Sequence, residues 1–123
     1  MKLSTIQKRN TLNQVHRCGD SGNGGAYHQY EVFSNEYPPE TTEQGLLQVN
    51  FQNGARNMPD SISGVLDGDL LEIIRDRLSC FQKGDYATRE NAIALTHIEE
   101  ALLWMAKRAD DRAERGVLGT TSK

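Results

Sequence analysis

The sequence predicts an α+β protein in which a small N-terminal antiparallel β-sheet precedes a long two-helix antiparallel hairpin, and which assembles as an oligomer. Short strand-like runs separated by glycine- and proline-rich turns over residues 11–54 predict the sheet. Apolar residues that recur every three or four positions over residues 69–116 predict the helices. Only 37% of the 123 residues are hydrophobic, which is little for one core at this length and predicts a partner chain. We expect residues 1–123 to form a single domain with a flexible N-terminus at residues 1–10.

Three strands are expected. The first two runs, residues 11–17 and 26–33, lie on either side of a glycine-rich turn at residues 19–25, which predicts a β-hairpin. Residues 46–51 alternate in character and predict a third strand, which the Asn53-Gly54 turn closes. The glycine-rich turn joins two strands rather than a strand and a helix, so it lacks the context of a phosphate-binding loop.

A first helix of about four turns is expected from Asp69 to the residues before Gly84, which supplies a C-terminal stop. Its expected apolar face consists of Leu70, Ile74, Leu78 and Phe81.

A second helix is predicted from Arg89 to Arg115, because this segment has neither proline nor glycine, and Gly116 ends it. Asp85 or Thr88 can serve as its N-cap. Its apolar stripe is expected to be Ala94, Ile98, Ala101, Leu102 and Met105, widened by Leu95 and Trp104. A helix of roughly 40 Å exceeds the length of its own small domain, so we expect its excess to pack against another subunit.

Charge and composition exclude several classes of protein. A net charge of −3 argues against binding to DNA or RNA polymers, which needs a broad excess of Lys and Arg. No segment resembles a signal peptide or a membrane span, which predicts a cytoplasmic protein without a membrane partner. Cys18 and Cys80 are expected to be free thiols, and neither they nor the three histidines have the spacing of a metal site, so no metal and no cofactor are predicted.

The stripe of the second helix becomes cationic at Arg108, Arg112 and Arg115. One interpretation is that neighbouring acids neutralise these charges, or that cations simply favour a helix C-terminus. The acidic neighbours are Asp110, Asp111 and Glu114. The other interpretation is an anion site, because guanidinium groups bind phosphate oxygens bidentately and remain charged at any physiological pH.

Phe81 and Tyr86 lie around the expected hairpin turn, close to Asn91 at the start of the second helix. Phe81 is either the last core residue of the first helix or a platform on which a base stacks, with Asn91 reading a base edge. Arg108 lies far along the helix from this turn, so one chain cannot easily bring both groups to one ligand. An antiparallel partner helix can.

Several segments together resemble a known family. They are Phe51-Gln52-Asn53-Gly54, Phe81-Gln82, the run from Arg89 to Leu95, the run from Arg108 to Arg112, and the run from Arg115 to Thr120. The chain resembles the Thoeris anti-defence 1 family of phage proteins over about residues 26–120, most specifically over the helical hairpin, which that family shares with the anti-CBASS 2 sponges.

The resemblance implies a protein that binds glycocyclic ADP-ribose, a signal made by bacterial TIR-domain proteins, and holds it without degrading it. Thoeris immunity is then blocked in the cytoplasm of the infected bacterial host. Some relatives also bind cyclic di- or trinucleotides at separate sites. Members form homo-oligomers, either dimers or hexamers, with ligand pockets where helices of neighbouring chains meet. No enzymatic activity is expected, because capture needs stacking groups and fixed cations but no nucleophile or base.

Residue by residue, the resemblance implies that Phe81 stacks on adenine, that Asn91 makes a polar contact, and that Arg108 and Arg112 bind phosphate. Arg115 and Gln52 match ligand-contacting positions of the family less closely. Arg56 follows the Phe-Gln-Asn-Gly segment, but the residues after it depart from the family pattern.

Two alternative functions stay open. The first is a hydrolase of the same nucleotide, with His97 or Glu99 as the base. The second is an inhibitor whose long helix docks on a host protein and whose arginines belong to that interface.

Overall fold

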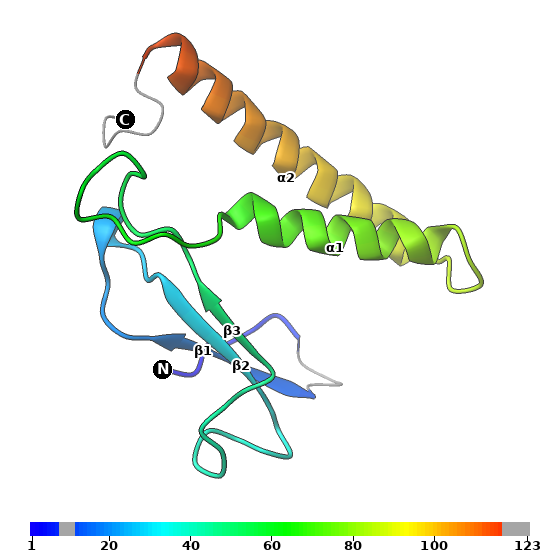
Figure 1. Ribbon diagram of the computed structural model, residues 1–123. Helices are drawn as coiled ribbons and strands as arrows, with labels where there is room; N and C mark the ends of the chain where they lie inside the picture. Colours follow the sequence, from blue (N-terminus) through cyan, green and yellow to red (C-terminus); the bar gives the residue numbers. More distant parts are fainter. Residues whose placement is uncertain (8–11, 117–123) are drawn as a thin grey trace. The chain divides into compact units, whose positions relative to one another are not determined.

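The structure is a computed structural model that describes residues 1–7 and 12–116 (Figure 1). It consists of two compact units, which are described separately. The first holds residues 1–54 and 60–64, and the second holds residues 55–59 and the described residues from 65 onward. Residues 8–10 of the expected flexible N-terminus, and the end of the segment that resembles the family, lie outside the described residues.

The first unit contains the predicted antiparallel sheet. Its strands are β1 (Asn13–Cys18), β2 (Gln29–Ser34) and β3 (Leu47–Asn50), in the order β1-β2-β3. All three expected strands are confirmed, with ends shifted by up to three residues. Phe33 and Val49 are the buried hydrophobic residues among those described, so the core of this unit is small.

The conformation of the turn between β1 and β2 accounts for the glycines in its sequence. It contains a short 3₁₀ turn, Asn23–Gly25, in which Gly24 and Gly25 have φ angles of 74° and 77°. Residues with a Cβ rarely adopt this left-handed conformation, so the glycine-rich sequence is a requirement of the hairpin.

Residues 1–3, part of the N-terminus expected to be flexible, lie along the edge of β1. The backbone N–H of Leu3 donates to the carbonyl of Val15, and the N–H of Arg17 donates to the carbonyl of Met1. These bonds satisfy the outer edge of β1, whose backbone groups would otherwise lack partners within the sheet. The polar composition of the segment gave no sign of this pairing.

The second unit contains the predicted helical hairpin, formed by α1 (Asp67–Gln82) and α2 (Arg89–Glu114). α1 begins two residues earlier than expected, where the side chain of Asp69 accepts a hydrogen bond from the backbone N–H of Leu66 at 2.8 Å. Thr88 is the N-cap of α2, with its hydroxyl accepting from the backbone N–H of Asn91 at 3.0 Å. Gly116, with a φ of 72°, follows the C-terminus as predicted.

The two helices run antiparallel from their shared turn and diverge toward their other ends (Figure 1). Arg75 of α1 donates to Glu99 of α2 at 2.9 Å and also pairs with Glu72 at 3.4 Å. The hydrogen bond to Glu99, with the attraction of both carboxylates, raises the pKa of the Arg75 guanidinium above its usual value. This exposed ion pair joins the helices near the middle of the hairpin.

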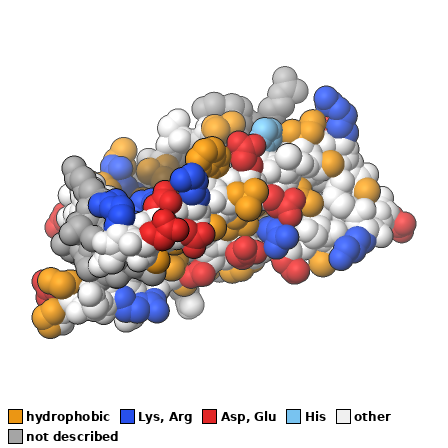
Figure 2. Space-filling model, turned by 90° about the horizontal axis from the view of Figure 1, so that it is seen from above, with side chains coloured by type: hydrophobic (Ala, Val, Ile, Leu, Met, Phe, Trp, Pro, Cys, Tyr) orange, Lys and Arg blue, Asp and Glu red, His pale blue; other side chains and the backbone are white. Residues whose placement is uncertain are grey.

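Part of the predicted apolar packing is absent. The sequence predicts that Trp104 widens the packed apolar stripe of α2, but Trp104 is 64% exposed. Ile74 and Met105, also predicted to pack, are exposed as well. Because α2 has 26 residues and α1 has 16, the C-terminal end of α2 extends beyond the start of α1. Figure 2 shows hydrophobic side chains open to solvent among charged ones on one face of the molecule. Within the described range, no helix is both long and apolar enough to span a membrane.

Candidate functional site

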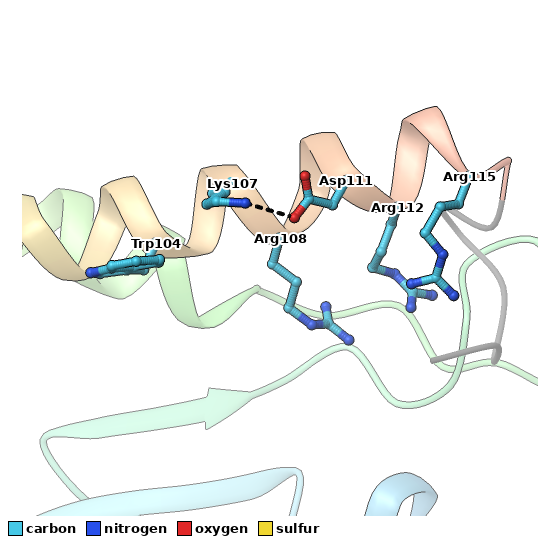
Figure 3. Close-up of a pocket in the computed structure, with 6 residues that line it drawn as sticks. All are labelled: Trp104, Lys107, Arg108, Asp111, Arg112 and Arg115. Carbon is cyan, nitrogen blue, oxygen red and sulfur yellow. Dashed lines mark hydrogen bonds and ion pairs between the residues drawn. The ribbon is translucent and has the colours of Figure 1, made fainter.

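The C-terminal part of α2 carries a concave basic surface with a volume of about 270 Å³. We call it the arginine face. Its residues are Trp104, Lys107, Arg108, Asp111, Arg112 and Arg115. Figure 3 shows the side chains of Arg108, Arg112 and Arg115 projecting from the same side of α2. Their spacing of four and three residues places them one above the other on a helix, so the local fold brings the three guanidinium groups together.

The arginine face is cationic although the chain is acidic. Four cations and one carboxylate line it, which leaves a local net charge of +3, whereas the whole chain has a net charge of −3. Asp111, the carboxylate on this face, pairs with Lys107 at 3.0 Å. The sequence left open that acidic neighbours neutralise the arginines. Asp111 instead pairs with Lys107, as the dashed line in Figure 3 marks.

The three arginines differ in exposure. Arg112 is 7% exposed and is the one buried residue of α2, whereas Arg108 and Arg115 are exposed. Arg108 makes no hydrogen bond or ion pair with any residue in the part of the chain that the structure describes. A buried guanidinium beside an exposed one gives the face a fixed cation and a second that is open to a ligand.

A second group of predicted site residues lies at the hairpin turn. Phe81, in the last turn of α1, is half-buried, and its ring meets that of Tyr86 edge to face at a centroid distance of 6.3 Å. The guanidinium of Arg77 lies 5.1 Å from the centroid of the Phe81 ring. Asn91 lies in the first turn of α2, where its backbone N–H completes the Thr88 cap. We call Phe81, Tyr86 and Asn91 the turn cluster.

The turn cluster and the arginine face are far apart in one chain. Asn91 and Arg108 are 17 residues apart on one continuous helix, which corresponds to about 26 Å along its axis. A single chain therefore does not bring the predicted stacking ring and the predicted phosphate ligands together.

Gln52 and Arg56 lie outside both groups. The side chain of Gln52 donates to the carbonyl of Gly54 at 3.1 Å and accepts from the backbone N–H of Gly64 at 3.2 Å, so both ends of its amide close a loop of the first unit. Arg56 is exposed and belongs to the second unit.

Sequence reasoning missed two members of the arginine face, Trp104 and Lys107, and gave Asp111 only as a neutralising neighbour. Trp104 precedes Arg108 by four residues, and this i, i+4 spacing was the available signal. Because it continues an apolar stripe, the sequence pattern predicts that this tryptophan belongs to the helical core. Its exposed indole instead bounds the arginine face (Figure 3).

The two candidate bases for a hydrolase, His97 and Glu99, lie on α2. The carboxylate of Glu99 accepts the hydrogen bond of Arg75 at 2.9 Å, and His97 is exposed on α2. Neither residue lines the arginine face.

These features define a small α+β protein with a helical hairpin that carries a local basic face. The protein-family model described as "Acb2/Tad1, hairpin domain" matches residues 47–110, just over half of the chain. The chain therefore belongs to the Acb2/Tad1 hairpin family. It is also 44% identical over 78 residues to a protein named Thoeris anti-defense 1 from Bacillus phage SBSphiJ7. That match covers 63% of this chain and 54% of the phage protein, so the chain spans about half the length of this relative.

Proposed function

We propose that this chain is a phage anti-defence protein that counters Thoeris immunity by binding glycocyclic ADP-ribose and holding it intact. The hairpin family and the name of the Bacillus phage relative support the anti-Thoeris role. The observation that most supports a nucleotide ligand is the arginine face, which has a net charge of +3 on an acidic chain. The site of action is the cytoplasm of the infected host, where the signal is made.

The arginine face suits the pyrophosphate of this ligand. Guanidinium groups form two parallel hydrogen bonds to phosphate oxygens and keep their charge at any physiological pH. Buried Arg112 supplies a fixed cation, and exposed Arg108 and Arg115 supply adjustable ones. Trp104 bounds the same concave surface and offers an apolar wall to the ribose or base. Cyclic di- and trinucleotides carry the same phosphate chemistry and are a second candidate class of ligand.

The turn cluster suits the adenine base. A half-buried Phe81 offers a ring for stacking, and Asn91 carries an amide that can donate and accept on a base edge. We also propose Gln52 and Arg56 as ligand contacts, with less support. The amide of Gln52 already closes a loop, and the residues after Arg56 depart from the family pattern.

The ligand site is completed by a second copy of the chain. The separation of about 26 Å between Asn91 and Arg108 exceeds the reach of one nucleotide, so the turn cluster of one copy must meet the arginine face of another. Exposed apolar side chains on both helices support such an assembly, since Ile73 is 62% exposed and Leu103 is 71% exposed. The proposed assembly is a dimer or a hexamer.

Sequestration needs no catalytic group. A protein that binds the signal more tightly than its effector does, and that is present in excess, starves the effector by mass action. The engagement of Glu99 by Arg75 supports this mechanism over hydrolysis, because the Glu99 carboxylate already accepts a hydrogen bond from a neighbouring guanidinium.

Isothermal titration with glycocyclic ADP-ribose tests the proposal, followed by heat denaturation of the complex and chromatography of the released ligand. Tight binding and an unaltered ligand are the expected results. A chemically altered ligand would show a hydrolase. Absence of binding, together with anti-Thoeris activity in cells, would show an inhibitor that acts on a host protein.

A further inference from the structure

The first unit contains a second pocket, with a volume of about 380 Å³, at one end of the β-sheet. Cys18 of β1 pairs with Gln29 of β2, which in turn pairs with Asn50 of β3, so three residues in register form one row across the sheet. Directly paired residues point to the same face of an antiparallel sheet, and all three line the pocket. We call it the sheet-end pocket.

Other residues that line the pocket are held by specific contacts. Asn53, after β3, pairs with Ile62 in an isolated antiparallel bridge, which holds the segment around Ile62 beside the end of β3. The side chain of Asn23 donates to the Asn53 amide oxygen at 2.7 Å, and the imidazole Nε2 of His28 lies 3.2 Å from the carbonyl oxygen of Asn23. The pocket is therefore formed before any ligand arrives, which reduces the entropy lost on binding.

Several polar side chains that line the pocket are open to a ligand. Gln29 and Asn50 carry amides, Asp20 a carboxylate and Ser63 a hydroxyl, and none of these four groups hydrogen-bonds to another residue within the described ranges. Phe51 lines the pocket beside them and contacts Tyr30 edge to face at 5.7 Å. Amides next to an aromatic ring are suited to a flat heterocycle with donors and acceptors on its edge.

The charge of the sheet-end pocket is opposite to that of the arginine face. None of the described residues that line it is Lys or Arg, and Asp20 adds a carboxylate. This lining disfavours phosphate. Its volume lies in the range of roughly 300–1,000 Å³ that is typical of small-molecule sites.

We infer that the sheet-end pocket is a binding site for an uncharged nucleoside or nucleobase, held by the amides of Gln29 and Asn50 and by Phe51. It is distinct from the arginine face and does not depend on the function proposed above. It discriminates against nucleotides, because a phosphate group meets the Asp20 carboxylate without a compensating cation.

Titration of the full chain with adenosine, guanosine, cytidine and uridine, and with the matching 5′-monophosphates, tests the inference. Amide chemical shifts of ¹⁵N-labelled protein provide the readout. Saturable binding of at least one nucleoside, with shifts centred on Gln29 and Asn50, is expected. The matching monophosphate should bind about tenfold more weakly, because its phosphate is repelled by the Asp20 carboxylate.

Variants separate the pocket from other surfaces. Asn50→Ala should weaken nucleoside binding about three- to tenfold by removing one neutral hydrogen bond. Gln48→Ala is the matched control, because Gln48 is exposed on the same strand and does not line the pocket. Arg108→Ala should leave nucleoside binding unchanged, so that failure of the nucleotide proposal and failure of this one can be told apart. No saturable binding of any nucleoside, tighter binding of the monophosphate, or an equal effect of Gln48→Ala would overturn the inference.

Discussion

The Lys107 ammonium lies 3.0 Å from the Asp111 carboxylate, one helical turn further along α2. Both residues line the arginine face, and both are more than half exposed, so the pair itself contributes little to stability. Its electrostatic effect on a ligand is larger, because the carboxylate lowers the positive potential beside Arg108 and Arg112. Asp111 therefore sets how strongly this face attracts an anion.

Asp111→Asn should raise the affinity for glycocyclic ADP-ribose about two- to fivefold, the scale expected for a surface charge near an anion. The gain should shrink as salt is increased, because exposed charges are screened. Isothermal titration at two salt concentrations measures both effects. Asp110→Asn removes the same charge from an exposed neighbour that does not line the face, and it should change the affinity less. Equal gains from the two variants would show a general charge effect.

Arg108→Ala should weaken binding of the same ligand by about 1.5–3 kcal/mol, or roughly 10- to 150-fold, because a charge-assisted hydrogen bond to phosphate is lost. Its stability should change little, since Arg108 is exposed and lies near the end of α2. Arg89→Ala is the matched control, because Arg89 is an exposed arginine at the other end of the same helix. An unchanged affinity for Arg108→Ala would place the phosphate site elsewhere.

Local signals predicted most of the fold. The N-cap at Thr88 and the stop at Gly116 were readable because capping depends on a few neighbouring residues. Which face of α2 packs against α1 could be predicted from the sequence only where the two helices are in contact. Trp104 continued the apolar stripe, but Leu102 is the residue that lies beside Gly68 of α1, and a position two residues further along a helix lies on a different face.

The candidate site was predictable to a similar extent. The row of arginines follows from helical periodicity, and the structure places Arg108, Arg112 and Arg115 on one face as expected. The sheet-end pocket was not predictable, because it depends on strand register and on the long-range bridge between Asn53 and Ile62. Both are tertiary features with weak local signals.

Thr88→Ala should lower the free energy of unfolding by about 1 kcal/mol, because the first turn of α2 loses the hydroxyl that accepts from the Asn91 N–H. Urea denaturation of the unliganded protein measures this change. Thr96→Ala is the control, since the Thr96 hydroxyl bonds back to the carbonyl of Ala92 within the same helix and alanine favours helices. Equal destabilisation by the two variants would show that the cap contributes nothing specific.

A mixed assembly of two defective variants tests whether the turn cluster and the arginine face of different copies form one site. Phe81→Leu removes the stacking ring but keeps an apolar side chain, and it should weaken binding by about 1–3 kcal/mol, as Arg108→Ala should for its own reason. Co-expression with two different tags, and purification on both, isolates assemblies that contain both variants. If each site combines Phe81 of one copy with Arg108 of another, a dimer that holds one copy of each variant has one intact site out of two, so titration should show about half of the sites at full affinity. In hexamers of random composition the expected fraction is about a quarter. If each site is built within one chain, every site keeps one defect, and no tight binding returns at any mixing ratio.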